Sequence, residues 1–286
     1  MRVLVTGARG QLGVDLCREL SARGHFVIEA DIHNMDITDG EAVERFISEN
    51  APEAVIHCAA YTATDKAEDD TETCRLVNSV GTRNIAESCK AHGVKMLYIS
   101  TDYIFDGEGD TPFSVDSEAA PLSVYGKTKY EGEIAVKELL DEYFIVRISW
   151  VFGLHGNNFI KTMLRIARTA DEINAVADQI GSPTYTVDLS VLLADMIVTD
   201  KYGVYHATNE GFCSWYDFAC EIFKQSGIDI KVNPVGSDFF NYKIKRPENS
   251  RMDKSKLDEN GFSRLPPWQN ALRRFLDELK AEEAKA

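Results

Sequence analysis

The sequence has no long uninterrupted run of apolar residues and no pair of cysteines at C-x-x-C spacing. A helix that crosses a membrane needs about 20 consecutive, mostly apolar residues, so no membrane-spanning segment is expected. The six cysteines are scattered through apolar or helical contexts. Neither a zinc site nor a disulfide framework is therefore predicted, and most of the cysteines are expected to be small buried residues.

Positive charge is also scarce, since 31 Lys and Arg stand against 46 Asp and Glu, giving a formal net charge of −15. This excess of negative charge argues against nucleic acid or an anionic membrane as a partner. The first strand is predicted directly at the N-terminus and leaves no room for a signal peptide, so a cytoplasmic location is expected. The chain has 286 residues, of which 44% are hydrophobic, enough for one large or two modest globular domains.

The first thirteen residues carry the strongest local signal. The apolar run 3–5 predicts a buried strand, and the amphipathic stretch 11–20 predicts a helix. Between them Gly7, Gly10 and Gly13 are spaced Gly-x-x-Gly-x-x-Gly. Glycines let a pyrophosphate approach the backbone, and the first N–H groups of a helix attract anions. The strand–turn–helix context predicts a dinucleotide site; a glycine-rich turn without a ligand is the alternative.

The chain alternates between apolar runs and amphipathic stretches as far as residue 149. Strands are predicted at 25–30, 54–57, 96–99 and 144–149, and helices at about 41–50, 78–92 and 123–140. This alternation predicts an α/β fold with a doubly wound parallel sheet, that is, a Rossmann-like fold. Later segments are less regular, with helices expected at about 159–168, 186–199, 214–225 and within 265–284, and strands at 173–177, 202–206 and 228–235.

Two domains are expected from this change of pattern. Residues 1–152 are predicted to form the dinucleotide-binding domain, with segments of 170–208 returning to it. Residues 153–286 are predicted to form mainly a smaller α/β substrate-binding lobe.

Asp31 lies at the end of the second predicted strand. An acidic residue there can accept hydrogen bonds from the adenosine ribose, which favours NADH slightly over NADPH. Arg9 in the glycine turn favours NADPH instead, because its guanidinium could bind a 2′-phosphate. A simple strand-end cap is the alternative role for Asp31. His57, at the end of the third predicted strand, has no partner at metal-ligand spacing, so a core or strand-end histidine is expected.

Thr101, Tyr125 and Lys129 form the candidate catalytic group. Tyr125 and Lys129 are four residues apart at the start of a predicted helix, so their side chains share one face. A hydride added to a carbonyl leaves an alkoxide that needs a proton. A free tyrosine has a pKa of about 10, and a nearby ammonium is expected to lower the pKa of Tyr125. The hydroxyl of Thr101, at the end of a predicted strand, could hold the same substrate oxygen. An ordinary helix face is the alternative for the Tyr–Lys pair.

These motifs, at 6–13, 100–102 and 125–129, together resemble those of the extended short-chain dehydrogenases/reductases. Within that superfamily, the segments 58–62, 100–107, 149–153, 157–159, 178–184 and 246–247 are similar to the dTDP-4-dehydrorhamnose reductase family. The resemblance implies an enzyme that transfers a hydride from NAD(P)H to the 4-keto group of a dTDP-4-dehydro-6-deoxy sugar, in dTDP-rhamnose synthesis. The implied partner is a nucleotide-diphosphate sugar.

The resemblance also implies roles for individual residues. At the cofactor's pyrophosphate they are Gly7, Gly10, Gln11 and Leu12. Asp31 is implied at the adenosine, and Asp36 and Ile37 at the adenine. The middle of the cofactor is flanked by Ala59, Ala60 and Tyr61, and its nicotinamide end by Tyr125 and Lys129. For the substrate they are Thr101, Asp102, Trp150, Asn158 and Arg246. Trp150 as a core residue, Asn158 as a helix cap and Arg246 as a surface charge are the plainer alternatives.

Some relatives are described as magnesium-linked dimers, so the resemblance leaves a homodimer open; no matching carboxylate cluster is recognised, and no metal site is predicted. Two other functions also stay open. One is a nucleotide-sugar dehydratase or epimerase of the same fold; dehydratases typically carry Thr-Asp-Glu where this chain has Thr101-Asp102-Tyr103. The other is a non-catalytic dinucleotide-binding subunit, since the beta subunit of methionine adenosyltransferase resembles the same family.

Overall fold

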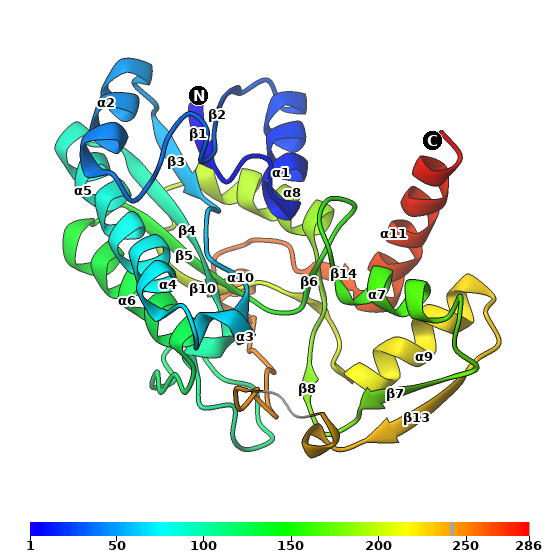
Figure 1. The fold of residues 1–286 in the computed structure, drawn as a ribbon. Coiled ribbons are helices and arrows are strands. Elements are labelled where there is room, and N and C mark those ends of the chain that lie inside the picture. Colours follow the sequence, from blue (N-terminus) through cyan, green and yellow to red (C-terminus); the bar gives the residue numbers. More distant parts are fainter. Residues whose placement is uncertain (241–242, 286) are drawn as a thin grey trace.

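A parallel sheet forms the centre of the first lobe (Figure 1). The structure is a computed structural model that describes residues 1–240 and 243–285, and within them this sheet has six strands. In spatial order the strands are β10 (Gly203–His206), β5 (Tyr143–Ile148), β4 (Lys95–Thr101), β3 (Ala54–His57), β1 (Arg2–Thr6) and β2 (Phe26–Ala30). Each neighbouring pair is parallel, which confirms the predicted fold class.

Helices cover both faces of this sheet because its strands are apolar on both sides. Val3 and Val5 belong to one buried cluster and Leu4 to the other, and all three are 0% exposed. One face carries α1 (Gln11–Ala22) and α8 (Thr186–Ile197), and the other carries α2 (Gly40–Asn50), α5 (Thr82–His92) and α6 (Val124–Leu139). Figure 1 shows the second group to the left of the sheet.

The helix predicted over residues 78–92 is the end of a longer helical stretch that begins at Thr71. The structure has α3 (Thr64–Ala67), α4 (Thr71–Arg75) and a π-helical segment η1 (Leu76–Gly81) before α5. Asn78 in η1 is only 1% exposed, and its side chain bonds to both backbone groups of Tyr61. π-helical insertions often occur at functional sites. Here the insertion fastens the loop after β3 to the helical layer.

A second, smaller lobe packs around an aromatic core that includes Phe152, Phe218, Trp268 and Phe275. Its helices and paired strands are α7 (Phe159–Ile166), β7 (Glu172–Val176), α9 (Trp215–Ser226), β13 (Lys231–Val235) and α11 (Trp268–Glu283). The shorter elements of the whole chain are η2 (Asp102–Ile104), β6 (Val151–Phe152), β8 (Ile180–Gly181), β9 (Thr184–Tyr185), β11 (Asn209–Glu210), β12 (Cys213–Ser214), η3 (Ser237–Phe239), α10 (Ser255–Glu259) and β14 (Leu265–Pro267).

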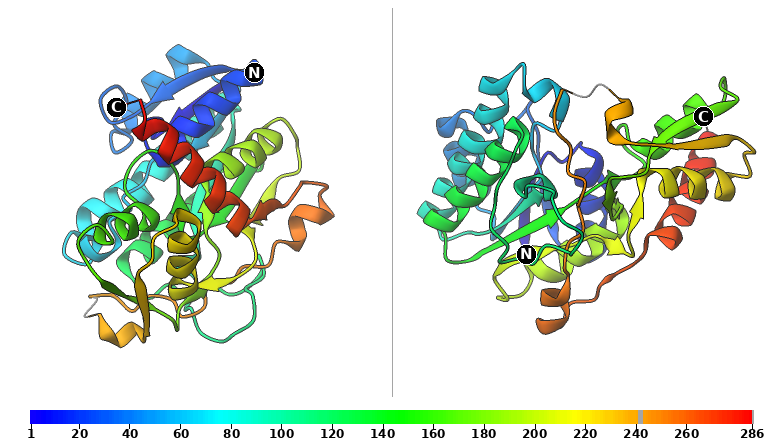
Figure 2. Two further views of the ribbon diagram at one scale, coloured as in Figure 1. Left: turned by 90° about the vertical axis from the view of Figure 1, so that its right-hand side faces the viewer. Right: turned by 90° about the horizontal axis from the view of Figure 1, so that it is seen from below.

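The chain passes between the lobes several times. α8 and β10 lie in the layers of the first lobe although they follow the first segments of the second. Residues 243–254 run back from the second lobe along the first, as the right-hand view of Figure 2 shows. Asn249 Nδ2 donates to the carbonyl oxygen of Thr111 at 2.8 Å, and Phe113 pairs with Met252. The domain boundary at residue 152 stays a prediction.

Candidate active site

The glycine-rich turn joins β1 to α1 in a conformation that needs small residues. Gly7 has φ +63°, a left-handed conformation that glycine adopts without strain. A Cβ on Gly7 would lie 2.9 Å from the backbone of Ala59, and one on Gly13 would overlap the carbonyl oxygen of Gly7. Gly10 is the N-cap of α1, and no side chain of the described residues caps this end. The first N–H groups of α1 are therefore available to an anion.

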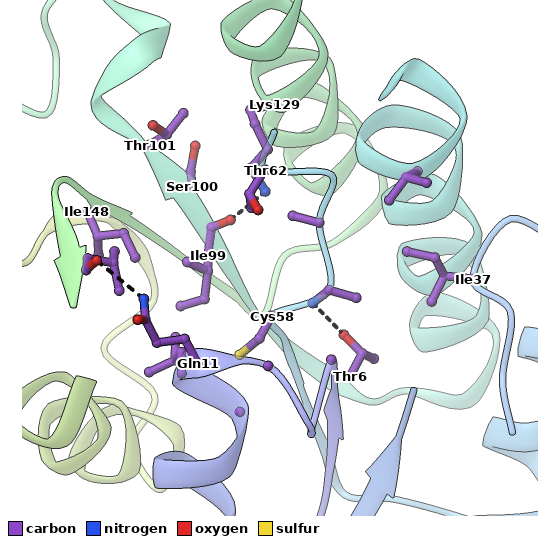
Figure 3. A pocket seen from close by; sticks show the side chains of 18 of the residues that line it. Thr6, Gln11, Ile37, Cys58, Thr62, Ile99, Ser100, Thr101, Lys129 and Ile148 are labelled. Carbon is purple, nitrogen blue, oxygen red and sulfur yellow. Dashed lines mark hydrogen bonds between the residues drawn. The ribbon is translucent and has the colours of Figure 1, made fainter. Parts of the chain in front are cut away.

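A cavity of about 670 Å³ opens beside this turn, at the carboxyl ends of β1, β3 and β4 (Figure 3). Its size is typical of cofactor and ligand sites. It is lined by the predicted residues Gly7, Gly10, Gln11, Leu12, Asp31, Asp36, Ile37, Ala59, Ala60, Thr101, Asp102, Tyr125, Lys129 and Trp150. Tyr61, Asn158 and Arg246 are not part of the lining. Lining residues for which the sequence predicted no role in a site include Ile32, Met35, Thr38, Cys58, Ile99 and Ser100.

Arg9 and Asp31, which favour NADPH and NADH respectively, form an ion pair with each other. Arg9 Nε lies 2.8 Å from Asp31 Oδ2, although the Arg9 side chain is 73% exposed. The adjacent Ile32 is 66% exposed, and an apolar side chain there offers a surface to a flat ring. Asp36 is engaged in its own turn, because its Oδ1 accepts hydrogen bonds from the Thr38 amide and hydroxyl.

The candidate catalytic group is assembled by the first turn of α6. Ser123 caps this helix, accepting a hydrogen bond from the Gly126 amide at 3.1 Å. A Cβ on Gly126 would overlap the carbonyl oxygen of Tyr103, so the helix packs directly on the loop that follows β4. Tyr125 and Lys129 thereby line the same cavity as Thr101.

The Lys129 ammonium is bound in the wall of the cavity. Its Nζ donates to the carbonyl oxygen of Ile99 at 2.7 Å and lies 4.1 Å from the centre of the Tyr98 ring; Figure 3 shows the first contact. Lys129 is 2% exposed, and burial lowers its pKa to about 7, while the negative charge of Glu133 opposes this shift. Lys129 thus changes charge near neutrality.

The pKa of Tyr125 is shifted in the direction opposite to the one expected from the sequence. Burial raises this pKa well above its ordinary value, Asp102 raises it further, and the Thr101 hydroxyl acts in the other direction. The expected lowering by Lys129 is not observed, because the ammonium is held on the Ile99 carbonyl. At neutral pH Tyr125 is therefore a protonated phenol, suited to donate a proton rather than to accept one.

A buried polar network behind Lys129 was missed by sequence reasoning. Glu133, one helical turn after Lys129, is 0% exposed and forms a double contact with Arg147 on β5, at 2.8 and 2.9 Å. The hydroxyl of Ser100, which lines the cavity, donates to the same carboxylate at 2.6 Å. The one available signal was the spacing of Glu133 from Lys129; its partners lie on other strands and leave no local pattern.

Asp102 and Trp150 form another part of the cavity wall. Asp102 is 3% exposed, and its Oδ1 accepts a hydrogen bond from the Thr101 hydroxyl at 3.0 Å. Burial raises the pKa of Asp102 to about 6, although the Ser250 and Thr101 hydroxyls lower it. Trp150 follows β5 with φ +49°, a left-handed conformation that is rare for a bulky residue.

The expectations for His57, for a metal site and for a membrane span can be compared with the described residues. His57 is completely buried, its ring contacts the hydroxyls of Thr6 and Thr82, and burial lowers its pKa to about 3. The predicted core or strand-end histidine is confirmed, since His57 is also the last residue of β3. Among the described residues no group of three His, Cys, Asp or Glu side chains is placed to hold a metal ion. The described helices include none with the length and apolar character that a membrane span requires.

Comparison with known proteins agrees with this geometry. The model of the RmlD substrate binding domain family matches residues 1–281. The chain belongs to this family. A dTDP-4-dehydrorhamnose reductase of Mycolicibacterium smegmatis is 40% identical over 275 residues, which cover 95% of this chain and 84% of that protein. A dTDP-4-keto-6-deoxy-D-glucose reductase of Streptomyces niveus is 36% identical, with 99% of each chain covered. The solved dTDP-4-dehydrorhamnose reductase of Bacillus anthracis, in complex with NADP, has a TM-score of 0.94, 43% identity, and coverage of 97% and 99%.

The three remaining predicted residues of this RmlD-family chain do not line the cavity. Asn158 caps α7, and its Nδ2 donates to Gln11 Oε1 at 3.1 Å, which ties the second lobe to the glycine turn. Arg246 forms an ion pair of 2.7 Å with Asp65 in α3. Tyr61 is held through its backbone by Asn78. Asn158 thus has the plainer of its two expected roles, that of a helix cap.

Proposed function

We propose that this protein is an NAD(P)H-dependent reductase that converts dTDP-4-dehydro-L-rhamnose to dTDP-L-rhamnose. The observation that carries this proposal is the convergence of Thr101, Tyr125 and Lys129 on the cavity that begins at the glycine turn. Whole-length relatives named as dTDP-4-dehydrorhamnose reductases support the same activity. A binding protein would not need a half-buried phenol, a buried hydroxyl and a buried ammonium in one wall of the site.

The residues of the glycine turn fit a nicotinamide dinucleotide. The backbone of Gly7 and Gly10 and the uncapped first turn of α1 would hold the pyrophosphate, and Asp31 would bind the adenosine ribose. Bound there, the reduced cofactor supplies the hydride. Lys129, now on the Ile99 carbonyl, would hold the ribose of the nicotinamide end.

Tyr125 supplies the proton in this proposal. Reduction of a keto group places negative charge on its oxygen, and a nearby protonated phenol neutralises that charge. The raised pKa of Tyr125 keeps the proton available at neutral pH. The Thr101 hydroxyl, fixed by its bond to Asp102, holds the same oxygen and orients the sugar.

A modest preference for NADH follows from Asp31, which can accept a hydrogen bond from a ribose hydroxyl but repels a 2′-phosphate. The ion pair with Arg9 weakens this preference, because rotation of the exposed Arg9 side chain would give a 2′-phosphate a partner. Values of kcat/KM for NADH and NADPH measure the outcome, and a strong NADPH preference contradicts it. The matched variants Arg9→Ala and Asp31→Asn separate the two contributions.

The nucleotide-diphosphate sugar would lie against Asp102 and Trp150, with Asn158 and Arg246 toward its diphosphate. The full-length relative named for dTDP-4-keto-6-deoxy-D-glucose makes that sugar a second candidate substrate. It presents the same 4-keto group, so both substrates belong in one assay.

The decisive test follows nicotinamide absorbance together with product, using purified protein and each of the two dTDP-4-keto sugars. We expect one reduced cofactor to be consumed for each product molecule. Product formed without net loss of reduced cofactor would assign the protein to the epimerases. Tight cofactor binding with no product from either sugar would favour the non-catalytic subunit.

A further inference from the structure

Trp150 is held in an unusual conformation by Thr184, the first residue of β9. Its φ of +49° is accompanied by a hydrogen bond from the Thr184 amide to its carbonyl oxygen at 3.1 Å. The hydroxyl of Thr184 also donates to the carbonyl oxygen of Ser149 at 2.6 Å. Backbone conformations of this kind persist only where the surroundings enforce them, and they cluster at functional sites. The backbone therefore sets the direction of the Cα–Cβ bond of Trp150, but it does not set the orientation of the indole ring.

The orientation of the indole is determined by the second lobe. The Trp215 ring stacks on that of Trp150, with centroids 3.6 Å apart and planes inclined by 15°. Gly181 lies against the same indole so closely that a Cβ would come within 2.9 Å of Trp150 Cε2. Trp150 is thus confined by an aromatic ring and a backbone segment, and it still lines the cavity.

Trp215 is itself firmly anchored. It is the first residue of α9, directly after the Ser214 N-cap, and Ser214 and Asp217 form a reciprocal capping box. The ring of Phe159 lies 4.6 Å from that of Trp215, so the indole is continuous with the aromatic core of the second lobe. A side chain supported in this way transmits the position of the second lobe to the cavity wall.

We propose that Trp215 is a positioning residue that holds the Trp150 indole ready for the sugar nucleotide; this rests on the substrate role proposed above for Trp150. Without the stacked ring, the indole regains rotational freedom, and ordering it again upon binding weakens affinity for the sugar nucleotide. The dinucleotide contacts of the glycine turn do not involve Trp215. Loss of stacking therefore raises KM for the sugar and leaves cofactor affinity and kcat nearly unchanged.

The chain contains three tryptophans, which makes the arrangement measurable. Two stacked indoles couple their transitions and produce a paired circular-dichroism band. We expect Trp150→Phe and Trp215→Phe each to abolish this band. Trp268→Phe is the matched control, because Trp268 lies in the same aromatic core and packs on Phe218. It should retain the band.

Kinetics and fluorescence then test positioning itself. Trp215→Leu should raise KM for the sugar nucleotide about tenfold, near the upper contribution of one aromatic pair, and Trp215→Phe should recover most of it. On the Trp268→Phe background, the same two substitutions leave Trp150 as the sole tryptophan. Its anisotropy decay should show fast local rotation in the Trp215→Leu variant and restrained rotation in the Trp215→Phe variant.

These measurements distinguish the two proposals. A wild-type protein without turnover would overturn the proposed function, while the anisotropy of Trp150 would still decide whether Trp215 restrains it. Equal rotation of Trp150 in the Leu and Phe variants would overturn the positioning role. A native KM in an active Trp215→Leu enzyme would do the same, even if the dichroism band were lost.

Discussion

Asp102 is expected to destabilise the ligand-free protein at neutral pH. Its pKa is raised by burial from 3.8 to about 6, so the folded state binds the proton more tightly than the unfolded chain does. A raised carboxyl pKa means that stability falls as pH rises from about 4 to 6 and is constant above. A shift of about 2 units corresponds to about 3 kcal/mol of unfolding free energy at pH 7.5.

Asp102→Asn removes this cost while retaining the size of the side chain and an oxygen that can accept from Thr101. We expect the variant to be about 3 kcal/mol more stable than the wild type at pH 7.5, falling to about 1 kcal/mol at pH 4.5. For a chain of this length, the larger value corresponds to a rise in Tm of about 5 °C. If Asp102 also binds the sugar, the same variant raises KM for the nucleotide sugar.

The assay is urea unfolding of the ligand-free protein between pH 4.5 and 8, with Asp110→Asn as the control. Asp110 is exposed and lies in the loop between η2, which contains Asp102, and α6, so its substitution should change stability little at any pH. An Asp102→Asn protein that is less stable than the wild type at pH 7.5 would refute the reasoning. It would mean that hydrogen bonds to the carboxylate outweigh the cost of burying its charge.

Three further predictions concern the catalytic wall. Tyr125→Phe should lower the rate of reduction by about 10²–10⁴-fold and leave the cofactor Kd nearly unchanged, because the phenol supplies a proton; steady-state rates and cofactor titration measure this, and near-native turnover would remove Tyr125 from the mechanism. Cofactor affinity should decline as pH rises through about 7, because Lys129 loses its positive charge there; titrations from pH 6 to 9 should show the decline in the wild type and, if Lys129 is responsible, a weak, pH-independent affinity in Lys129→Met. Glu133→Gln should lower the pKa of Lys129 and shift that decline to lower pH, whereas an unshifted profile would separate Glu133 from Lys129.

The sequence determined the features that depend on neighbouring residues. The glycine turn, the alternation of strands and helices and the helix that carries Tyr125 and Lys129 were predictable, because each leaves a short-range pattern of side-chain size, polarity or spacing. The same holds for His57, whose buried position follows from its place in an apolar strand. These patterns specify the parallel sheet and the chemical groups that meet at its carboxyl edge.

The tertiary structure alone decided how those groups interact. The Arg9–Asp31 pair, the Glu133–Arg147 contact and the stacking of Trp150 on Trp215 join residues 14 to 65 positions apart. The Lys129 ammonium contacts the Ile99 carbonyl and not Tyr125, and burial raises the pKa of the phenol. Burial and long-range contact depend on how whole layers pack, and a linear pattern of residues carries no direct record of that packing.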